Sequence, residues 1–130
     1  MKSKVTSKFK QTEIKKLFEG KWNIVKMSNW DEDYFNMEVR AYIRIDKNCT
    51  GEFQFGLVSG SVDGRFKKDA EGTIFDFTWD GCDECDPANG DGWMKVENGG
   101  TAEGEFRFHM GDTSLFWAKK VRNRGVKKNK

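Results

Sequence analysis

The residues best suited to metal chemistry lie in one acidic stretch, 80–92, which reads as a loop between two strands. Carboxylate oxygens in a loop that contains glycine are the ligands that Ca²⁺ and Mg²⁺ prefer. The weak candidate ligands are Asp80, Asp83, Glu84, Asp86 and Asp91. The EF-hand spacing fails, because it would place Pro87 at the first ligand position. The alternative, which we favour, is an exposed loop that its charge keeps soluble.

Two of the three cysteines, Cys82 and Cys85, fall in the same stretch with C-x-x-C spacing. A redox pair normally begins a helix whose dipole stabilises the thiolate, whereas here carboxylates surround the thiols and disfavour it. A zinc site would need Cys49 and His109 from distant turns as further ligands. We therefore expect free thiols without a role in chemistry.

His109 is the one His of the chain, and Asp112 and Ser114 follow it closely. Adjacency in sequence is not the geometry of a Ser-His-Asp triad, and no nucleophile elbow is present. Because Phe106 and Phe108 read as inward-facing, His109 is expected to face outward or to lie at a rim. No acid and base have a spacing that indicates catalysis, so we expect neither an enzyme nor a cofactor.

An aromatic cluster among acids, from Trp30 to Phe35, is a candidate of another kind. It stands between two predicted strands, where it could be a lid over a cavity or a plug that fills it. Together with inward-facing rings of the strands it forms the predicted ligand-binding set. That set is Trp30, Tyr34, Phe53, Phe55, Phe75, Phe77, Phe106 and Phe108. Trp79, Trp93 and Trp117 lie on predicted strands and are expected in the core.

One short helix precedes the strands that must position these residues. Thr12 can cap the helix and Gly20 can end it. Ile14, Leu17 and Phe18 fall on one face, with the spacing of an apolar stripe. The helix is therefore expected to cover one open end of a barrel.

After the helix, the hydrophobic period changes to two, which predicts antiparallel strands. The predicted strands are 21–28, 37–46, 51–58, 61–67, 72–79, 93–97, 101–110 and 113–121. Val39 and Leu57 are expected to face inward. The fourteen Gly are expected mainly in turns, and Ser59-Gly60 is predicted to be one turn between strands. Short turns force neighbouring strands to be antiparallel, so the fold class is an all-β, eight-stranded up-and-down barrel with a short N-terminal helix.

The chain of 130 residues is predicted to be one barrel domain, 13–121, between basic tails at 1–12 and 122–130. Residues 1–12 and 119–130 hold eleven Lys or Arg and no acid. Residues 13–118 hold 12 basic residues and all 21 acids, a net charge of −9. A body of this charge predicts no nucleic-acid binding outside the tails. Without a secretory signal, or the roughly 20 apolar residues of a membrane span, a cytoplasmic protein is expected.

Gly20-Lys21-Trp22, at the start of the first strand, resembles the G-x-W signature of the calycins, which include the lipocalins and the fatty-acid-binding proteins. The resemblance implies that Trp22 packs across the closed end of the barrel, under a basic side chain from the last strand. Lys119, Lys120 and Arg122 are the candidates for that side chain. Only residues 28–36 stand where fatty-acid-binding proteins insert a helical pair.

The chain also resembles a group of short bacterial proteins of unknown function. The shared segments are Trp30-Asp31, FQFG at 53–56, DECD at 83–86 with GDGW at 90–93, and HMGDTSLFWA at 109–118. This resemblance implies the fold and no activity.

The sequence leaves two functions open. The preferred one is non-enzymatic binding of a small apolar or amphipathic ligand inside the barrel. The alternative is a filled barrel that acts as an interaction module for a protein partner or a second copy of the chain. Eight strands leave room for their own side chains or for one small ligand, so the packing of the interior separates the two. Metal binding at 80–92 is a third hypothesis.

Overall fold

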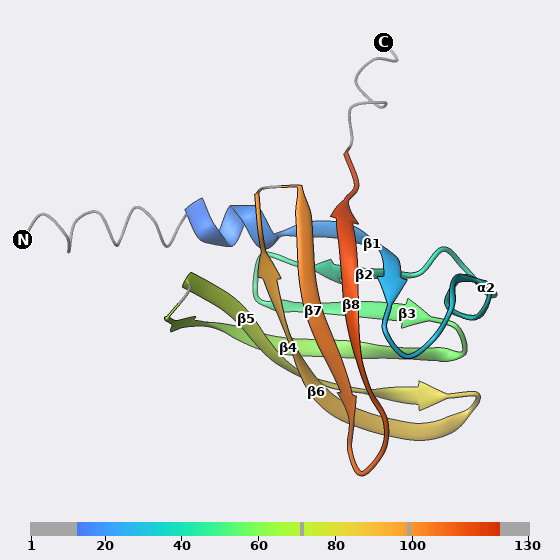
Figure 1. Ribbon diagram of the computed structural model, residues 1–130. Coiled ribbons are helices and arrows are strands. Elements are labelled where there is room, and N and C mark those ends of the chain that lie inside the picture. Colours follow the sequence, from blue (N-terminus) through green and yellow to red (C-terminus); the bar gives the residue numbers. More distant parts are fainter. Residues whose placement is uncertain (1–12, 71, 99, 123–130) are drawn as a thin grey trace, which may run out of the picture.

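The computed structural model describes residues 13–70, 72–98 and 100–122, and its strands close into one antiparallel barrel. The strands are β1 (Gly20–Met27), β2 (Tyr42–Ile45), β3 (Thr50–Phe55), β4 (Val58–Asp69), β5 (Gly72–Asp83), β6 (Asp86–Val96), β7 (Thr101–Phe108) and β8 (Thr113–Lys120). Each strand pairs with its neighbours in sequence, and β1 also pairs with β8, which closes the sheet (Figure 1). The predicted all-β, eight-stranded up-and-down barrel is confirmed.

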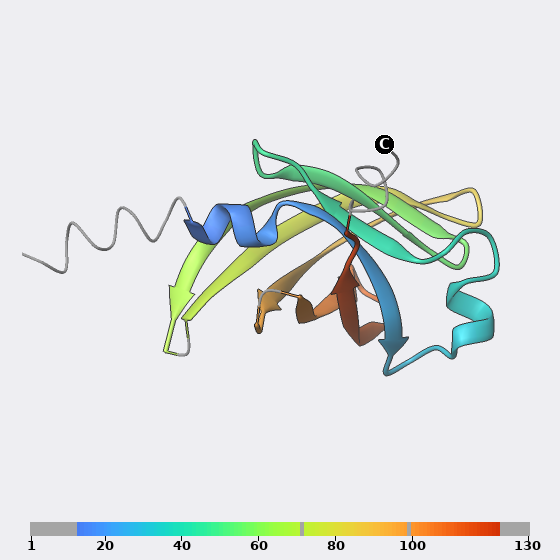
Figure 2. The same ribbon diagram turned by 90° about the horizontal axis from the view of Figure 1, so that it is seen from above.

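Among the described residues, two short helices lie at opposite ends of the barrel (Figure 2). Residues 13–18 form the predicted N-terminal helix, and α2 (Glu32–Phe35) interrupts the connection from β1 to β2. Phe18 is buried as predicted, but Leu17 is 42% exposed. Thr12, the predicted cap, lies outside the described residues.

The up-and-down topology divides the connections between two ends of the barrel. The closed end carries the 13–18 helix and the connections β2–β3, β4–β5 and β6–β7. The mouth carries the 28–41 segment with α2 and the connections β3–β4, β5–β6 and β7–β8. Residues 13 and 122, the outermost described residues, both lie at the closed end.

Glycines inside the sheet make room for the phenylalanine rings of the core. Phe77 is paired across the strands with Gly92, and Phe116 with Gly104. A Cβ atom on Gly92 would lie 2.7 Å from the Phe77 ring, and one on Gly104 would lie 2.5 Å from the Phe116 ring. The rings, together with the backbone carbonyls of Glu105 and Trp93, therefore occupy the space that a side chain would take at these glycines. These glycines are strand residues, so the expectation that glycine serves mainly in turns is wrong.

The turn between β3 and β4 is also displaced from its predicted position. Gly56, with a φ of +59°, turns the chain, and β4 then runs straight through the predicted reversal at Ser59-Gly60. The left-handed conformation favours glycine, which lacks the Cβ that would clash. Leu57 consequently lies in the turn rather than facing inward, and Val58 takes the buried position.

The second strand is shorter than predicted, because α2 redirects the chain before it. The side-chain oxygen of Asn36 accepts a hydrogen bond from the Ala41 backbone at 2.8 Å, which closes residues 37–40 into a bend. Val39 lies in that bend and is 42% exposed, so its predicted inward orientation is wrong. Ala41, the next expected inward residue, is fully buried.

The largest correction concerns residues 80–92, which form a long β-hairpin instead of a loop. β5 and β6 stay paired out to Asp83 and Asp86, and Glu84-Cys85 make the turn. Both turn residues have positive φ, 54° and 76°, as the type I′ turn of a two-residue hairpin requires. Asp, Gly, Asn and Pro are poor strand formers, so the local sequence conceals a strand that pairing with its neighbours stabilises.

Substitution of Gly104 by Ala is expected to lower the free energy of unfolding by about 1–3 kcal/mol, because the new methyl would clash with the Trp93 backbone carbonyl and overpack the Phe116 ring. Gly100→Ala is the matched control, since a Cβ there meets no atom within 4 Å. Urea unfolding of the two variants measures the difference. Equal stability of both variants would contradict the ring–glycine packing.

Candidate ligand site at the barrel mouth

Five of the predicted ligand-binding rings pack together inside the barrel. They are Phe53, Phe55, Phe75, Phe77 and Phe106, and none is more than 2% exposed. The ring centroids of Phe53 and Phe106 lie 4.7 Å apart, and those of Phe77 and Phe106 lie 5.9 Å apart. Phe75 extends the contacts to the N-terminal helix at the closed end. The protein's own rings thus occupy the interior that the sequence offered to a ligand.

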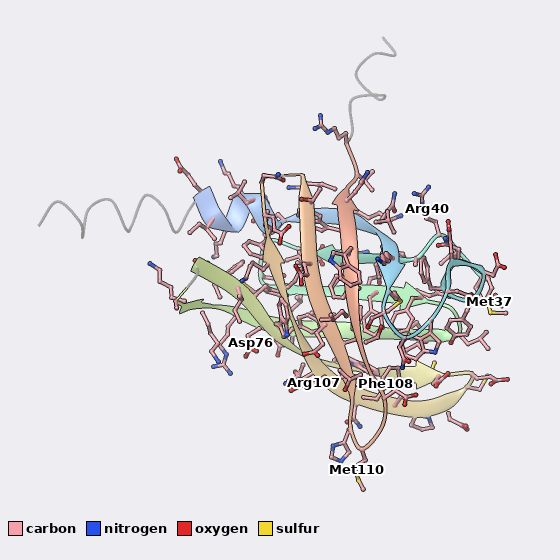
Figure 3. All side chains as sticks on the ribbon, in the orientation of Figure 1. Met37, Arg40, Asp76, Arg107, Phe108 and Met110 are labelled. Carbon is pink, nitrogen blue, oxygen red and sulfur yellow. The ribbon has the colours of Figure 1, made fainter. Side chains whose placement is uncertain are left out.

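Trp30 covers these rings at the mouth. Its indole is half-buried, and its centroid lies 5.3 Å from the ring of Phe55, 5.9 Å from that of Tyr34 and 6.1 Å from that of Phe108. Figure 3 shows Phe108 at the mouth end of β7, beside the turn whose tip carries Met110. Trp30, Tyr34 and Phe108, three residues of the predicted ligand-binding set, are therefore brought together at the rim of the mouth, while the other five predicted rings lie beneath them.

The segment that carries Trp30 is attached to the barrel on its N-terminal side by β8. The Asn29 backbone donates to the Ser114 hydroxyl at 3.0 Å, and the Leu115 backbone donates to the Ser28 hydroxyl at 2.9 Å. Ser114 is the one buried polar residue of the described core. Its hydroxyl also donates to a backbone carbonyl, so it is engaged in structure rather than paired with His109.

On the C-terminal side, the β3–β4 turn attaches the same segment. The Gly56 backbone donates to the Phe35 carbonyl at 2.8 Å, and the Tyr34 hydroxyl accepts from the Leu57 backbone at 3.2 Å. A Cβ on Gly56 would overlap the Tyr34 ring, so the contact requires glycine. Trp30 lies between the two attachments and forms no hydrogen bond of its own with the described residues.

Trp79 contains the one buried side-chain nitrogen or oxygen of the described residues that has no hydrogen-bond partner, its indole Nε1. The side chain is 3% exposed, and its ring lies nearly perpendicular to those of Phe53 and Phe108, at centroid distances of 5.2 and 5.1 Å. A ring face is only a weak acceptor. A buried donor without a partner costs about 1–3 kcal/mol. The core position of Trp79 was predicted. Its unpaired donor was not, because the residues that could offer an acceptor lie on other strands, which the local sequence does not place.

The other two strand tryptophans lie on the outer wall, so their predicted core positions are wrong. Trp117 stands between buried Phe116 and Ala118, and the period of two places it outside, where Lys26 Nζ lies 5.0 Å from its ring. Trp93 is half-buried and donates from Nε1 to a Glu105 carboxylate at 3.0 Å.

The candidate metal ligands at 80–92 do not converge. Asp83 and Asp86 are cross-strand partners on one face, but Asp80 lies three residues before Asp83 on the same strand and so faces the opposite side. Asp91 is bound by Arg107 through two hydrogen bonds of 2.9 Å. Cys49 lies in the β2–β3 connection at the closed end, whereas Cys82 and Cys85 lie at the mouth. Across the described ranges, no group of three or more His, Cys, Asp or Glu could hold a metal ion.

The rim of the mouth is acidic. Its connections and the hairpin tip, 28–41, 56–57, 83–86 and 109–112, contain eight carboxylates and one basic side chain, Arg40. Arg40 and Met37 project outward on the segment after α2 (Figure 3). His109 is exposed in the β7–β8 turn, as predicted. The mouth therefore combines apolar rings, one unpaired indole donor and a negative rim.

The closed end is completed by Lys120, the one of three expected basic residues that lies over Trp22. Its Nζ lies 5.3 Å from the Trp22 ring and donates to the carbonyl oxygens of Lys16 and Leu17 at 3.4 and 3.1 Å. These bonds satisfy carbonyls at the end of the N-terminal helix. Burial lowers the pKa of Lys120, and the coulombic attraction of Glu19 opposes that shift.

Comparison of the chain with protein-family models, with curated proteins and with solved structures finds no match. Over the described ranges, no helix has the length and apolar character needed to cross a membrane.

Trp22 and Trp79 provide a direct test of the unpaired donor. Both are buried, but Trp22 Nε1 donates to the Phe18 carbonyl at 2.9 Å. We expect Trp22→Phe to cost about 1–3 kcal/mol more unfolding free energy than Trp79→Phe, because only the first breaks a buried hydrogen bond. Urea unfolding gives both values. Equal losses would mean that Trp79 Nε1 has an acceptor in solution.

Proposed function

We propose that the barrel mouth binds a small aromatic molecule that carries a hydrogen-bond acceptor, in the place that Trp30 occupies in this structure. The observation that carries the proposal is the buried Trp79 Nε1, which has no acceptor among the described residues. Buried donors are nearly always paired, so one without a partner indicates a missing acceptor. A ligand acceptor would remove this cost on binding.

The position of Trp79 supports this assignment. The rings of Trp79 and Trp30 both contact Phe108, so one ring lies between the two indoles. A ligand that displaces the Trp30 indole and shifts Phe108 can therefore reach Nε1. Phe75 and Phe77 lie deeper and stay packed, so the proposed site is the mouth rather than the whole barrel.

Trp30 can leave its place without breaking a hydrogen bond. Its segment is attached by backbone hydrogen bonds on both sides, while the indole itself is held by contacts with Tyr34, Phe55 and Phe108. Aromatic pairs contribute about 0.5–1.5 kcal/mol each beyond burial. An incoming aromatic ring replaces these contacts, so the exchange of one ring for another costs little packing.

The charge of the site defines the ligand further. Eight carboxylates and one arginine surround the mouth, so the ligand is neutral or cationic. A carboxylate taken into the barrel could accept from Trp79 Nε1 but would find no cation, since Ser114 is the one buried polar or charged residue of the described chain. Fatty acids are therefore poor candidates, although the fold and the Trp22–Lys120 contact resemble the calycins, many of which carry ligands.

Quinoline and naphthalene are matched probes, because they share a shape and only quinoline has an acceptor. We expect Trp30→Ala to bind quinoline at least about tenfold more tightly than the unaltered chain, since the plug is gone. In that variant, the affinity for quinoline should exceed that for naphthalene by about tenfold, and the further substitution Trp79→Phe should abolish this difference. Isothermal titration calorimetry measures each affinity.

Trp117→Ala is the control, because it removes a tryptophan from the outer wall and should leave quinoline binding unchanged. Quinoline-2-carboxylate should bind more weakly than quinoline. Equal binding of quinoline and naphthalene in every variant would remove Trp79 from the site. Failure of Trp30→Ala to bind any probe, with its circular dichroism unchanged, would contradict the ligand site itself.

A filled barrel that binds a protein partner is the second candidate. The observation that favours it is the row formed by Trp93, Glu105 and Leu115, which are paired across the outer wall of three adjacent strands. Aromatic side chains are enriched at protein interfaces, and half-exposed Trp93 is held in place there by its hydrogen bond to Glu105. This function would remain if the mouth binds none of the probes.

A further inference from the structure

Positive charge gathers at the closed end of the barrel. Lys15, Lys16, Lys119 and Arg122 are exposed there, and none forms an ion pair with another described residue. The described segments at this end, 13–19, 46–49, 97–98 and 119–122, hold six basic and four acidic side chains in all. Residues 1–12 and 123–130, of which the structure describes none, are attached to this end through residues 13 and 122. They add eight Lys or Arg and no acid.

Two exposed aliphatic side chains stand among these charges. Leu17 is 42% exposed and follows two lysines on the N-terminal helix, and Val121 is 38% exposed between two basic residues after β8. The opposite face of the helix is fixed to the barrel, because Phe18 is buried and its ring centroid lies 5.1 Å from that of Phe66. The helix therefore holds Leu17 and its lysines toward solvent.

The mouth has the opposite charge. Its eight carboxylates face one arginine, at the other end of every strand from the basic residues. A negatively charged surface would attract the closed end and repel the mouth, so the charges define one orientation. In that orientation the mouth stays open to solvent.

We infer that the closed end docks on an anionic lipid bilayer, with its Lys and Arg side chains at the phosphates and with Leu17 and Val121 at the headgroup boundary. Basic residues that flank exposed apolar side chains are the pattern of proteins that lie on membranes. Nucleic acid offers the same phosphates, but single strands are held by exposed aromatic rings. The large hydrophobic side chains that are exposed in the described residues include no aromatic ring.

Co-sedimentation with vesicles tests the inference on the full chain. We expect binding to vesicles of phosphatidylcholine with phosphatidylserine, and none to pure phosphatidylcholine. Binding should weaken at least about tenfold between about 50 and 200 mM salt, because counterions compete for the lysines. Absence of binding to the anionic vesicles at low salt would overturn the inference.

Charge-matched variants locate the contact. The double variant Lys15→Glu with Lys16→Glu should weaken vesicle binding at least about tenfold. Each lysine near an anionic membrane contributes up to about tenfold to the affinity. Arg40→Glu with Arg65→Glu makes the same change in net charge at the mouth and on the β4 wall, and should have little effect. An equal loss in both pairs would show that net charge alone matters and would overturn docking by the closed end.

Leu17→Gln distinguishes lipid from nucleic acid, because it leaves the charge unchanged. We expect it to weaken vesicle binding several-fold and to leave binding to a random double-stranded DNA unchanged. Tighter binding to the DNA than to the vesicles at the same salt, with no effect of Leu17→Gln on either, would overturn the lipid assignment in favour of nucleic acid. Circular dichroism of each variant verifies that the barrel is folded.

Discussion

A phenylalanine ring inside an eight-stranded barrel needs space that a facing side chain would occupy, and glycine on the neighbouring strand leaves that space free. Phe77 is paired across the strands with Gly92, and Phe116 with Gly104, so a large ring faces a residue without a side chain in both pairs. This arrangement explains how a narrow barrel holds so many aromatic residues. It also explains why the interior is filled from the N-terminal helix to the mouth, which leaves the end of the barrel as the place where a ligand could act.

At the mouth, the stack of aromatic rings ends. Trp30 closes the stack from a segment that belongs to no strand, and the segment is attached to β8 and to the Gly56 turn on either side. Beneath it, Trp79 is surrounded by rings and finds no acceptor for its Nε1. A wholly apolar core tolerates no polar atom at low cost. The Trp79 indole donor is therefore the one buried side-chain polar atom among the described residues that the packing of rings leaves without a hydrogen bond.

Charge separates the two ends of the barrel as clearly as topology does. The mouth carries the carboxylates of the α2 segment and of the β5–β6 hairpin, while the closed end carries Lys15, Lys16, Lys119 and Arg122 beside residues 13 and 122, where the described chain begins and ends. Lys120, also at the closed end, has a structural role: its Nζ donates to carbonyls of the N-terminal helix and lies over the Trp22 ring. A ligand at the mouth and a membrane at the closed end would use different surfaces. The two proposals are therefore independent, and either can fail without the other.

The sequence by itself determined the strands, the closure of the barrel and the inward rings, because a period of two and short turns are local properties that any single segment displays. The tertiary structure alone decided that 80–92 is a paired hairpin, since Asp83 gains its strand conformation from Val58 on β4 and Asp86 gains its own from Asp83 on β5, rather than from their own propensity. It likewise selected Lys120 from three basic candidates. It also left Trp79 without an acceptor, because hydrogen-bond partners come from residues that are distant in the chain and adjacent only after folding.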